Sequence, residues 1–401
     1  MKKKIITKIR KSVVANCISW NKDWKKHSPC GIDSREKIGR NIFQFFKCLI
    51  SIFVFLKNIK SKRVYVFQGL RNKIYCKAFK KNQVVIIGSY KEFFYCKKNG
   101  YHFIWSFPIQ SSVFLCIYRN INFFLDLVIS RWFSRFKSKK ITFFVHEDTQ
   151  PVGSFICFFS RYLSDSKTIC IQHATYLRNF HSKPQGYMSK YNFVWHFDQI
   201  KFLNFDKNYT FVIGNNYEAK AKMKGNPNII LVGPGNSLAN KDLYSYQIKN
   251  FIKLSKIIKK NLPLKIIYRP HPEELQTANL LEKLKTDFKI IDTSNKLIAL
   301  RQARSIFIGY VSSLLYEAKL AGHKTVFIKN KNYKNLSFVP DFNLRIGENT
   351  KFIEWVKSVV KNNYVSFLKK TNKANKNKSA KPLFRFVTAL KKLEKKYETS
   401  H

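Results

Sequence analysis

Acidic residues are scarce in this sequence: 23 Asp and Glu stand against 75 Lys and Arg in 401 residues, a formal net charge of +52. An excess of this size favours polyanionic partners, namely nucleic acid, an anionic membrane face or phosphorylated substrates. The chain is also rich in Phe and Tyr, with 37 and 20 copies. The codons of Phe and Tyr are rich in A and T, and so are those of lysine. Nucleotide bias is therefore a second explanation for the high lysine content. Charge alone therefore does not identify the partner.

Cysteine is missing from the whole second half, since all eight copies lie between Cys17 and Cys170. Their spacing is irregular and contains no C-x-x-C pair, which argues against a zinc or redox motif. Scattered single cysteines in a chain of this length are typical of a reduced, cytoplasmic protein. No two aspartates stand one residue apart, which argues against a metal-clamped sugar diphosphate site. We therefore expect no bound metal.

Long apolar runs are also absent. The start, Met1-Lys2-Lys3-Lys4, is basic, but the following residues are too polar for a signal peptide. The most apolar stretch, 42–56, has about fifteen residues where a membrane-spanning helix needs about twenty. Two interpretations remain for it: a core helix, or an amphipathic helix on the membrane surface with lysines toward lipid phosphates. We expect a protein on the inner face of the cytoplasmic membrane, with no spanning segment.

Several functional motifs are missing as well. Gly233-x-Gly235 lacks the third glycine of a dinucleotide fingerprint, because Leu238 stands there, so a nicotinamide or flavin site is not expected. There is no P-loop and no G-x-S-x-G elbow. No helix-turn-helix, zinc or RNA-reading pattern accompanies the basic charge, so specific nucleic-acid binding is not expected. We expect no cofactor.

What the chain does contain is a repeated alternation of strand-like and helix-like segments, which favours parallel sheets. We predict an α/β fold with two Rossmann-like, doubly wound domains facing a cleft. A polar, turn-rich break near 220–228 separates them. The predicted domains are an acceptor-side domain at 1–222 and a donor-binding domain at 223–365, followed by a basic loop and helix at 366–401. Such domains bind ligands at the carboxyl ends of their strands. The predicted strands are 64–68, 83–87, 103–107, 141–145, 168–172, 191–195, 209–213, 229–232, 264–268, 288–291, 305–308 and 324–328.

The segment Arg269-Pro270-His271-Pro272 directly follows a predicted strand. The prolines keep the turn out of helical conformation. Arg269 can place two donors on a phosphate, and His271 can add a third or protonate a departing oxygen. The alternative is a structural turn whose histidine caps a neighbouring helix.

Ser312 and Ser313 follow the next strand but one and are predicted to open a helix that ends at Gly322. Hydroxyls and free amides at such a helix start bind phosphate. Glu317, one turn further on, is suited to accept hydrogen bonds from ribose hydroxyls, as the acidic residue of dinucleotide folds does. The alternative is an ordinary helix cap with a solvated glutamate.

In the first half, His173 ends a predicted strand and is a candidate general base for an acceptor hydroxyl. Glu147 and Asp148, at the end of the neighbouring strand, compete for that role. Asp148 or Thr149 has a structural alternative, as the cap of a helix with Pro151 in its first turn.

Taken in order, these motifs resemble the GT-B transferases of bacterial surface glycans. The nearest parallels are the CDP-glycerol glycerophosphotransferase-like and capsule polysaccharide transferase families. Arg269-Pro270-His271-Pro272 and Ser312-Ser313 match their motifs, whereas Gln172-His173-Ala174 has alanine in place of glycine. The His-Pro and Ser-Ser pairs also resemble motifs of bacterial sialyltransferases, and the resemblance covers about residues 140–330.

The resemblance implies a metal-independent, inverting glycosyltransferase of capsule or O-antigen biosynthesis. Its donor would be a nucleotide-activated sugar, held through its phosphates by Arg269, His271, Ser312 and Ser313 and through its ribose by Glu317. His173, or else Asp148 or Glu147, would deprotonate a lipid-linked glycan acceptor. The alternatives are a glycerophosphotransferase using CDP-glycerol, and a non-catalytic protein that binds nucleic acid or membranes.

Overall fold

The structure is a computed structural model and describes residues 2–27, 59–148, 150–172, 188–196, 199–200, 204–214, 227–234, 241–271, 274, 288–290, 296–310, 312–329, 338–361 and 382–398. Several sequence-based expectations lie outside these residues: the apolar stretch 42–56, the candidate cap Thr149, the candidate base His173, a helix near Leu280 and the basic loop that begins at 366. The chain divides into two compact units: the first holds the described residues up to Gly214 together with those from Leu383 onward, and the second holds the described residues between them. The predicted boundary, at 222, falls outside the described residues.

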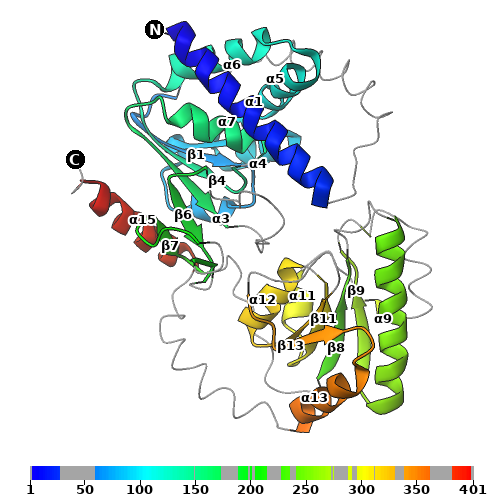
Figure 1. The fold of residues 1–401 in the computed structure, drawn as a ribbon. Helices are drawn as coiled ribbons and strands as arrows, with labels where there is room; N and C mark the ends of the chain where they lie inside the picture. Colours follow the sequence, from blue (N-terminus) through cyan, green and yellow to red (C-terminus); the bar gives the residue numbers. More distant parts are fainter. Residues whose placement is uncertain are drawn as a thin grey trace. The chain divides into compact units, whose positions relative to one another are not determined.

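The first unit contains a sheet of seven strands that are all parallel (Figure 1). Their spatial order is β3-β2-β1-β4-β5-β6-β7, so the winding reverses between β1 and β4. This is the doubly wound arrangement predicted from the sequence. The strands are β1 (Arg63–Gln68), β2 (Val84–Gly88), β3 (His102–Trp105), β4 (Lys140–Val145), β5 (Ser166–Ile171), β6 (Tyr191–Val194) and β7 (Thr210–Val212).

Helices cover both faces of this sheet. Because side chains alternate along a strand, Val64 and Val66 face one core while Tyr65 and Phe67 face the other. On the valine side lie α1 (Lys2–His27), α5 (Phe107–Arg119), α6 (Phe123–Phe136) and α7 (Pro151–Ser160). On the aromatic side lie α3 (Lys73–Cys76), α4 (Tyr90–Asn99) and α15 (Pro382–Glu398), with a short 3-10 turn at Lys81–Gln83 before β2.

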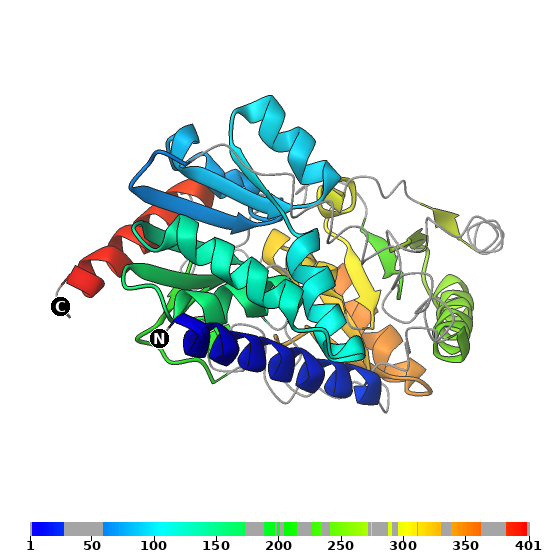
Figure 2. The ribbon, with the colours of Figure 1, turned by 90° about the horizontal axis from the view of Figure 1, so that it is seen from above.

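The N-terminal helix α1 was not predicted from the sequence. It buries Ile9, Val13 and Cys17 in the core it shares with α6 and α7, and Figure 2 shows it running along the helical layer. A hydrogen bond from the Asn16 side-chain amide to the Ser154 hydroxyl, 3.0 Å long, ties it to α7. The basic start of the chain is therefore an integral layer of this unit.

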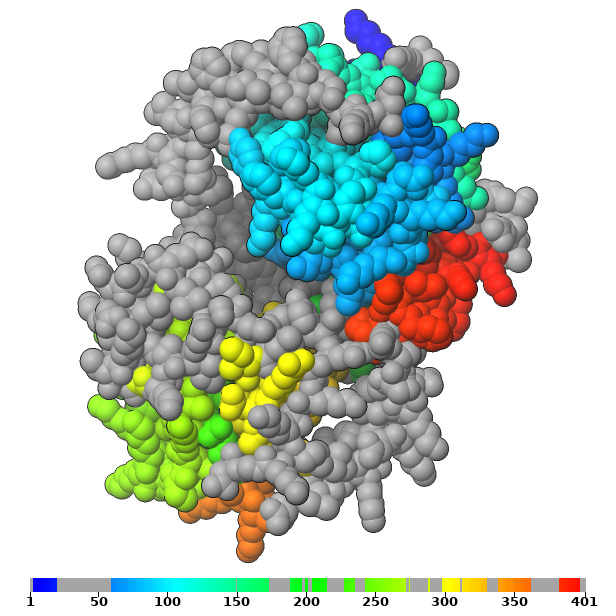
Figure 3. All heavy atoms as spheres, turned by 180° about the vertical axis from the view of Figure 1, so that it is seen from behind, coloured from blue at the N-terminus to red at the C-terminus, as the bar shows by residue number. Residues whose placement is uncertain are grey.

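The last helix, α15, also belongs to the first unit, although the sequence-based division set 366–401 apart. Its Phe386 ring stacks on Tyr75 with centroids 4.3 Å apart. Arg385 Nε donates to the carbonyl of Ile213 at 2.7 Å. In Figure 3 this helix (red) lies against the surface of the segment around β1 and α3 (blue).

The second unit contains six parallel strands in the order β10-β9-β8-β11-β12-β13, and its winding reverses between β8 and β11. It too is Rossmann-like, as predicted. The strands are β8 (Asn228–Val232), β9 (Lys265–Arg269), β10 (Lys289–Ile290), β11 (Ile306–Gly309), β12 (Lys324–Lys329) and β13 (Phe342–Arg345). The helices are α9 (Lys241–Asn261), α11 (Lys296–Leu300), α12 (Ser313–Ala321) and α13 (Asn349–Lys361), of which α9 and α13 share one core with the sheet.

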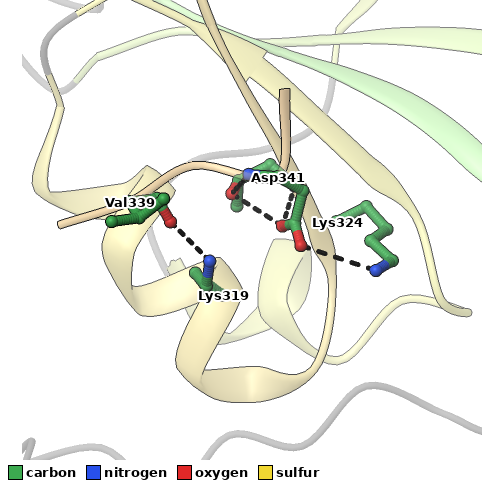
Figure 4. A network of polar contacts seen from close by, with 5 residues as sticks. Lys319, Lys324, Val339 and Asp341 are labelled. Atoms are coloured by element: carbon green, nitrogen blue, oxygen red, sulfur yellow. Dashed lines mark hydrogen bonds and ion pairs between the residues drawn. The ribbon is translucent and has the colours of Figure 1, made fainter. Parts of the chain in front are cut away.

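Strand β13 was not predicted, and a polar network holds the segment that leads into it (Figure 4). The carboxylate of Asp341 accepts hydrogen bonds from the amide and hydroxyl of Thr325, at 2.9 and 3.0 Å, and lies 3.4 Å from Lys324 Nζ. The ammonium of Lys319, on α12, donates to the carbonyl of Val339. These contacts fix the segment to β12 and α12.

Candidate functional site

In the second unit, strand pairing brings three predicted motifs to one edge of the sheet. The strand β8 lies between β9 and β11, so the residues after β8, β9 and β11 are neighbours at their carboxyl ends. The backbone amide of Gly233 donates to the carbonyl of Arg269 at 2.8 Å. This edge lies at the reversal of the winding, where open α/β sheets bind their ligands.

Helix α12 begins and ends where the sequence predicts. Ser312 has extended backbone angles, and its hydroxyl accepts a hydrogen bond from the Leu314 amide at 3.2 Å, which makes it the N-cap. Ser313 is the first helical residue and is partly exposed. At the other end, Gly322 adopts a left-handed φ of 96° that favours glycine. The capped, partly exposed helix start is therefore confirmed as a structural feature.

Arg269 is buried, with 6% of its surface exposed, and two carboxylates act on its charge. Burial lowers the pKa of Arg269, while the negative charges of Glu317 and Glu274 oppose that shift. Glu317 is itself only 3% exposed, so the alternative of a solvated glutamate is wrong. Because Glu317 lies one turn along α12 from Ser313, Arg269 places positive charge near the first turns of this helix.

Glu274 is fully buried and organises the turn after β9, a role that the sequence did not reveal. Its carboxylate accepts hydrogen bonds from the hydroxyls of Tyr244 at 2.5 Å and Tyr268 at 2.6 Å, and from the amide of His271. Burial raises the pKa of Glu274, and these hydrogen bonds act against the rise. No motif or spacing marks this residue, because its partners come from α9 and β9.

His271 is partly buried in the turn that Glu274 holds by its backbone amide. The turn after β9 is thus held by a buried carboxylate at the His271 amide. The catalytic or phosphate-binding use of the imidazole stays a prediction.

In the first unit, Asp148 anchors the chain near the start of β6. It is fully buried, and its Oδ2 accepts hydrogen bonds from the amides of Met188 at 2.8 Å and Ser189 at 3.1 Å, and from the Ser189 hydroxyl at 3.3 Å. The expected cap of α7 is wrong for Asp148, because Gln150 is the N-cap and makes no side-chain cap bond. The carboxylate accepts these three hydrogen bonds from residues 188–189, and the amides of α7 are not among the donors.

Glu147 lies in the same loop and is partly buried. Its amide donates weakly to the side chain of Gln68, at 3.4 Å. A side chain at Gly153 would collide with the Glu147 carbonyl, so the glycine permits α7 to pack tightly against this loop. The predicted roles of Glu147 and Asp148 as bases remain predictions.

His146 opens this loop and is a functional candidate that sequence reasoning passed over. Its Nδ1 lies 2.8 Å from the carbonyl oxygen of Gln68, and its amide donates to Gln68 Oε1 at 3.1 Å. A carbonyl only accepts, so Nδ1 carries the proton and Nε2 the lone pair. Burial, helped by the positive charge of Arg71, lowers the pKa of His146 to about 4, so the ring is neutral at pH 7. The available signal was its position at the end of a predicted strand.

His146 lines a pocket of about 210 Å³ at the carboxyl ends of β1, β2 and β4. The pocket therefore lies at the reversal of winding in the first unit. Among the described residues, no group of three or more His, Cys, Asp or Glu side chains could hold a metal ion. None of the helices in the described ranges is long and apolar enough to cross a membrane.

Neither a protein-family model nor a curated protein matches this sequence. Solved structures do match. TarM aligns at 15% identity with a TM-score of 0.41, over 68% of this chain and 58% of its own. The UDP-GlcNAc 2-epimerase of Methanocaldococcus jannaschii aligns at 15% identity with a TM-score of 0.44, over 75% and 92%. The enzyme of the same name from Neisseria meningitidis, bound to UDP-GlcNAc, aligns at 11% with 0.45, over 77% and 93%. This chain thus spans less than two thirds of TarM, and its function must be argued from its own residues.

Proposed function

We propose that this protein is a glycosyltransferase of the GT-B type, and that its second unit binds the phosphates of a nucleotide-activated donor. The observation that carries the proposal is the start of α12. There, a capped helix terminus with two hydroxyl-bearing residues follows β11, at the reversal of the sheet's winding. Helix starts in this position bind phosphate through free amides and the helix dipole.

The charges around this helix start support an anionic ligand. Arg269 supplies a positive charge that is shielded from bulk water, where its field is stronger than at the surface. The negative charges of Glu317 and Glu274 favour the charged form of that guanidinium. In the proposed complex the amides and hydroxyls of Ser312 and Ser313 bind the phosphates, Arg269 and His271 add positive charge or a donor, and Glu317 accepts from the ribose.

This arrangement would stabilise the departing nucleotide without a metal ion. When the bond from the donor carbon to the phosphate oxygen breaks, negative charge grows on that oxygen, and fixed donors nearby lower the barrier. A glycan hydroxyl would be the acceptor, and a direct displacement would invert the anomeric centre. The assignment of the acceptor to a lipid-linked glycan of a capsule or O-antigen follows from the motif resemblance.

Peripheral binding to an anionic membrane is the second part of the proposal. The connection between α5 and α6 exposes apolar side chains: Tyr118 at 43%, Ile121 at 37% and Phe123 at 68%. Arg119 stands exposed among them, and the adjacent α1 exposes Lys3 and other lysines. Aromatic side chains beside basic ones are suited to the headgroup region. Wild-type protein should sediment with anionic phospholipid vesicles more than a Phe123→Ser variant, and equal sedimentation would remove this assignment.

Calorimetric titration tests the donor site. CMP, CDP, UDP and GDP are titrated against the matching nucleosides and a short RNA. At least one nucleotide should bind at least tenfold more tightly than its nucleoside. The Ser312→Ala/Ser313→Ala double variant should bind that nucleotide about tenfold more weakly than wild type does. Ser89→Ala, which removes the cap of α4 in the first unit, is the matched control and should bind as wild type does. Base-independent RNA binding with no nucleotide preference would contradict the proposal.

A further inference from the structure

The strand β3 lies at an edge of the first unit's sheet, where within the described ranges it pairs with β2 alone. The Ser106 amide, just after β3, donates to the Gly88 carbonyl of β2 at 2.8 Å. Because successive strand residues point their backbone groups to opposite sides, the amides and carbonyls of Phe103 and Trp105 point away from β2. They make no hydrogen bond within the described part of the chain. Lysine and proline, which often protect such an edge, are absent from β3.

Aromatic rings from α4 and β3 contact one another beside this edge. Tyr90 and Phe94 expose 61% and 64% of their surface. The Trp105 ring lies 5.1 Å from the Tyr90 ring between centroids, and it stacks on Phe93 at 5.5 Å and on Phe107 at 5.7 Å. Exposed aromatic side chains that already hold one another in place are typical of the centre of a protein–protein interface. We call Tyr90, Phe93, Phe94, Trp105 and Phe107 the aromatic surface.

Lysines border the aromatic surface. Lys91, Lys97 and Lys98 are exposed on α4, and they form no ion pair within the described residues. The one acid of α4, Glu92, is engaged at the start of the helix, where it accepts hydrogen bonds from the Ser89 amide at 2.8 Å and the Ser89 hydroxyl at 2.7 Å. The border of the aromatic surface therefore attracts negatively charged groups.

We propose that the aromatic surface and the edge of β3 bind an acidic partner protein, through an extended segment that adds a strand to the sheet. Such a segment would pair with the outward amides and carbonyls of Phe103 and Trp105, place alternate apolar side chains against the rings, and bring carboxylates to the lysines. Because β3 has four residues, the segment needs about four to six. The inference rests on the first unit alone and does not depend on nucleotide binding in the second.

Two other occupants fit this surface less well. A second copy of this chain would bring lysines against lysines, in a protein whose formal net charge is +52. The hydrocarbon of a bilayer would offer no hydrogen-bond partner to the outward backbone groups of β3. The connection between α5 and α6, to which we assign the membrane contact, joins two helices and presents no strand edge.

Fluorescence polarisation with the full chain tests the proposal. The probe is a labelled synthetic peptide with blocked ends, in which glutamate and valine alternate. This peptide should bind at least about tenfold more tightly than one in which lysine replaces glutamate. Two further peptides carry N-methyl groups on alternate amides. Because only one side of an added strand bonds to β3, one of them should lose at least about tenfold in affinity and the other should stay within about threefold.

A ring variant, Tyr90→Ser/Phe94→Ser, locates the bound peptide. Both side chains are exposed, so the variant should keep the unfolding midpoint of wild type, and it should bind the peptide at least about tenfold more weakly. Tyr246→Ser/Phe384→Ser is the matched control. It removes two rings that are 50% and 65% exposed elsewhere, and it should bind within about twofold of wild type.

A charge variant, Lys97→Glu/Lys98→Glu, should also bind at least about tenfold more weakly. Lys253→Glu/Lys256→Glu makes the same change in net charge on the exposed face of α9 and should bind within about threefold of wild type. No binding of the alternating peptide, equal binding of the two N-methylated peptides, or equal losses in the variants and their controls would each overturn the proposal. So would a dimer, or binding to anionic phospholipid vesicles, that the ring variant abolishes, because the surface would then belong to a second copy or to a membrane.

Discussion

The carboxylate of Glu274 occupies the space that a side chain at residue 233 would need. A Cβ at Gly233 would collide with Glu274 Oε2 and would come within 2.7 Å of the His271 amide and 2.9 Å of the Tyr268 hydroxyl. The glycine after β8 is therefore required by a buried acid after β9. Together they set the shape of the sheet edge to which we assign the donor phosphates.

A double-mutant cycle measures this relationship. Gly233→Ala should lower the free energy of unfolding because Glu274 must move away from its three donors. Glu274→Ala also destabilises, since it leaves the hydroxyls of Tyr244 and Tyr268 without their acceptor. The double variant should be less destabilised than the sum of the two, by about 1–3 kcal/mol, in urea unfolding. Additive effects would show that the glycine is not needed for the acid.

Arg269 should be far more important to stability than an exposed arginine in an ion pair. Arg269→Met leaves Glu317 and Glu274 buried without their cation, and should lower the free energy of unfolding at pH 7 by about 3 kcal/mol. The loss should shrink at pH 5, because buried carboxylates without a cation take up protons more easily.

Arg345 provides the matched control for this experiment. It lies 3.9 Å from Glu348, and the two side chains are 70% and 49% exposed. Arg345→Met should cost less than about 1 kcal/mol. Equal losses for the two arginine variants would contradict the burial argument.

Asp148→Ala separates an anchoring role from a catalytic one. Because this carboxylate accepts three hydrogen bonds from Met188 and Ser189, its removal should cost about 2–3 kcal/mol. Asp206 accepts the Asn208 amide at 2.8 Å but is exposed, so Asp206→Ala should cost well under half as much. If Asp148→Ala kept full stability and lost only transfer, the anchor interpretation would be wrong.

The buried His323 should make the protein less stable in mild acid. Its Nδ1 accepts the Ser305 amide at 3.1 Å, so Nε2 carries the proton and donates to the Leu300 carbonyl at 2.9 Å. Burial lowers the pKa of His323 to about 4. Protonation would break the Ser305 bond, so the neutral form is the stable one.

The sign of this pH dependence follows from the lowered pKa. The folded pKa lies below the unfolded value of about 6.5, so the contribution is present above pH 6.5 and is lost as the pH falls toward 4. Between pH 7 and pH 5 wild type should lose about 2 kcal/mol more than His323→Gln, which has no proton to gain. Parallel losses in urea unfolding at the two pH values would contradict this assignment.

The start of α12 and the strands other than β13 could be predicted from the sequence because their signals are local. Apolar runs of four to six residues ended at turn formers, and Ser312 and Gly322 are the residues that helix ends prefer. Glu274 and His146 could not be identified as site residues in this way. Their roles depend on partners from other elements: the hydroxyl of Tyr244 on α9 in one case, and the carbonyl of Gln68 on β1 in the other.

The burial of individual charged residues also could not be predicted from local sequence patterns. Glu317 and Asp148 carry the charges of surface residues, yet both are enclosed, because Arg269 and the 188–189 amides offset the cost of removing them from water. The position of α15 shows the same limit. Its amphipathic pattern predicted a helix, but only the structure shows that this helix packs on the sheet of the first unit.

Binding of nucleoside diphosphates to Ser313→Asp and Ser313→Asn tests the central assignment most directly. The Asp and Asn side chains have the same size, and an aspartate in the first turn of a helix does not weaken the helix. Both variants should therefore keep the unfolding midpoint of the wild type. Of CDP, UDP and GDP, the one that binds wild type most tightly should bind Ser313→Asn within about threefold and Ser313→Asp at least tenfold more weakly. Equal binding by the two variants, or no binding of any of the three to wild type, would contradict a phosphate site at the start of α12.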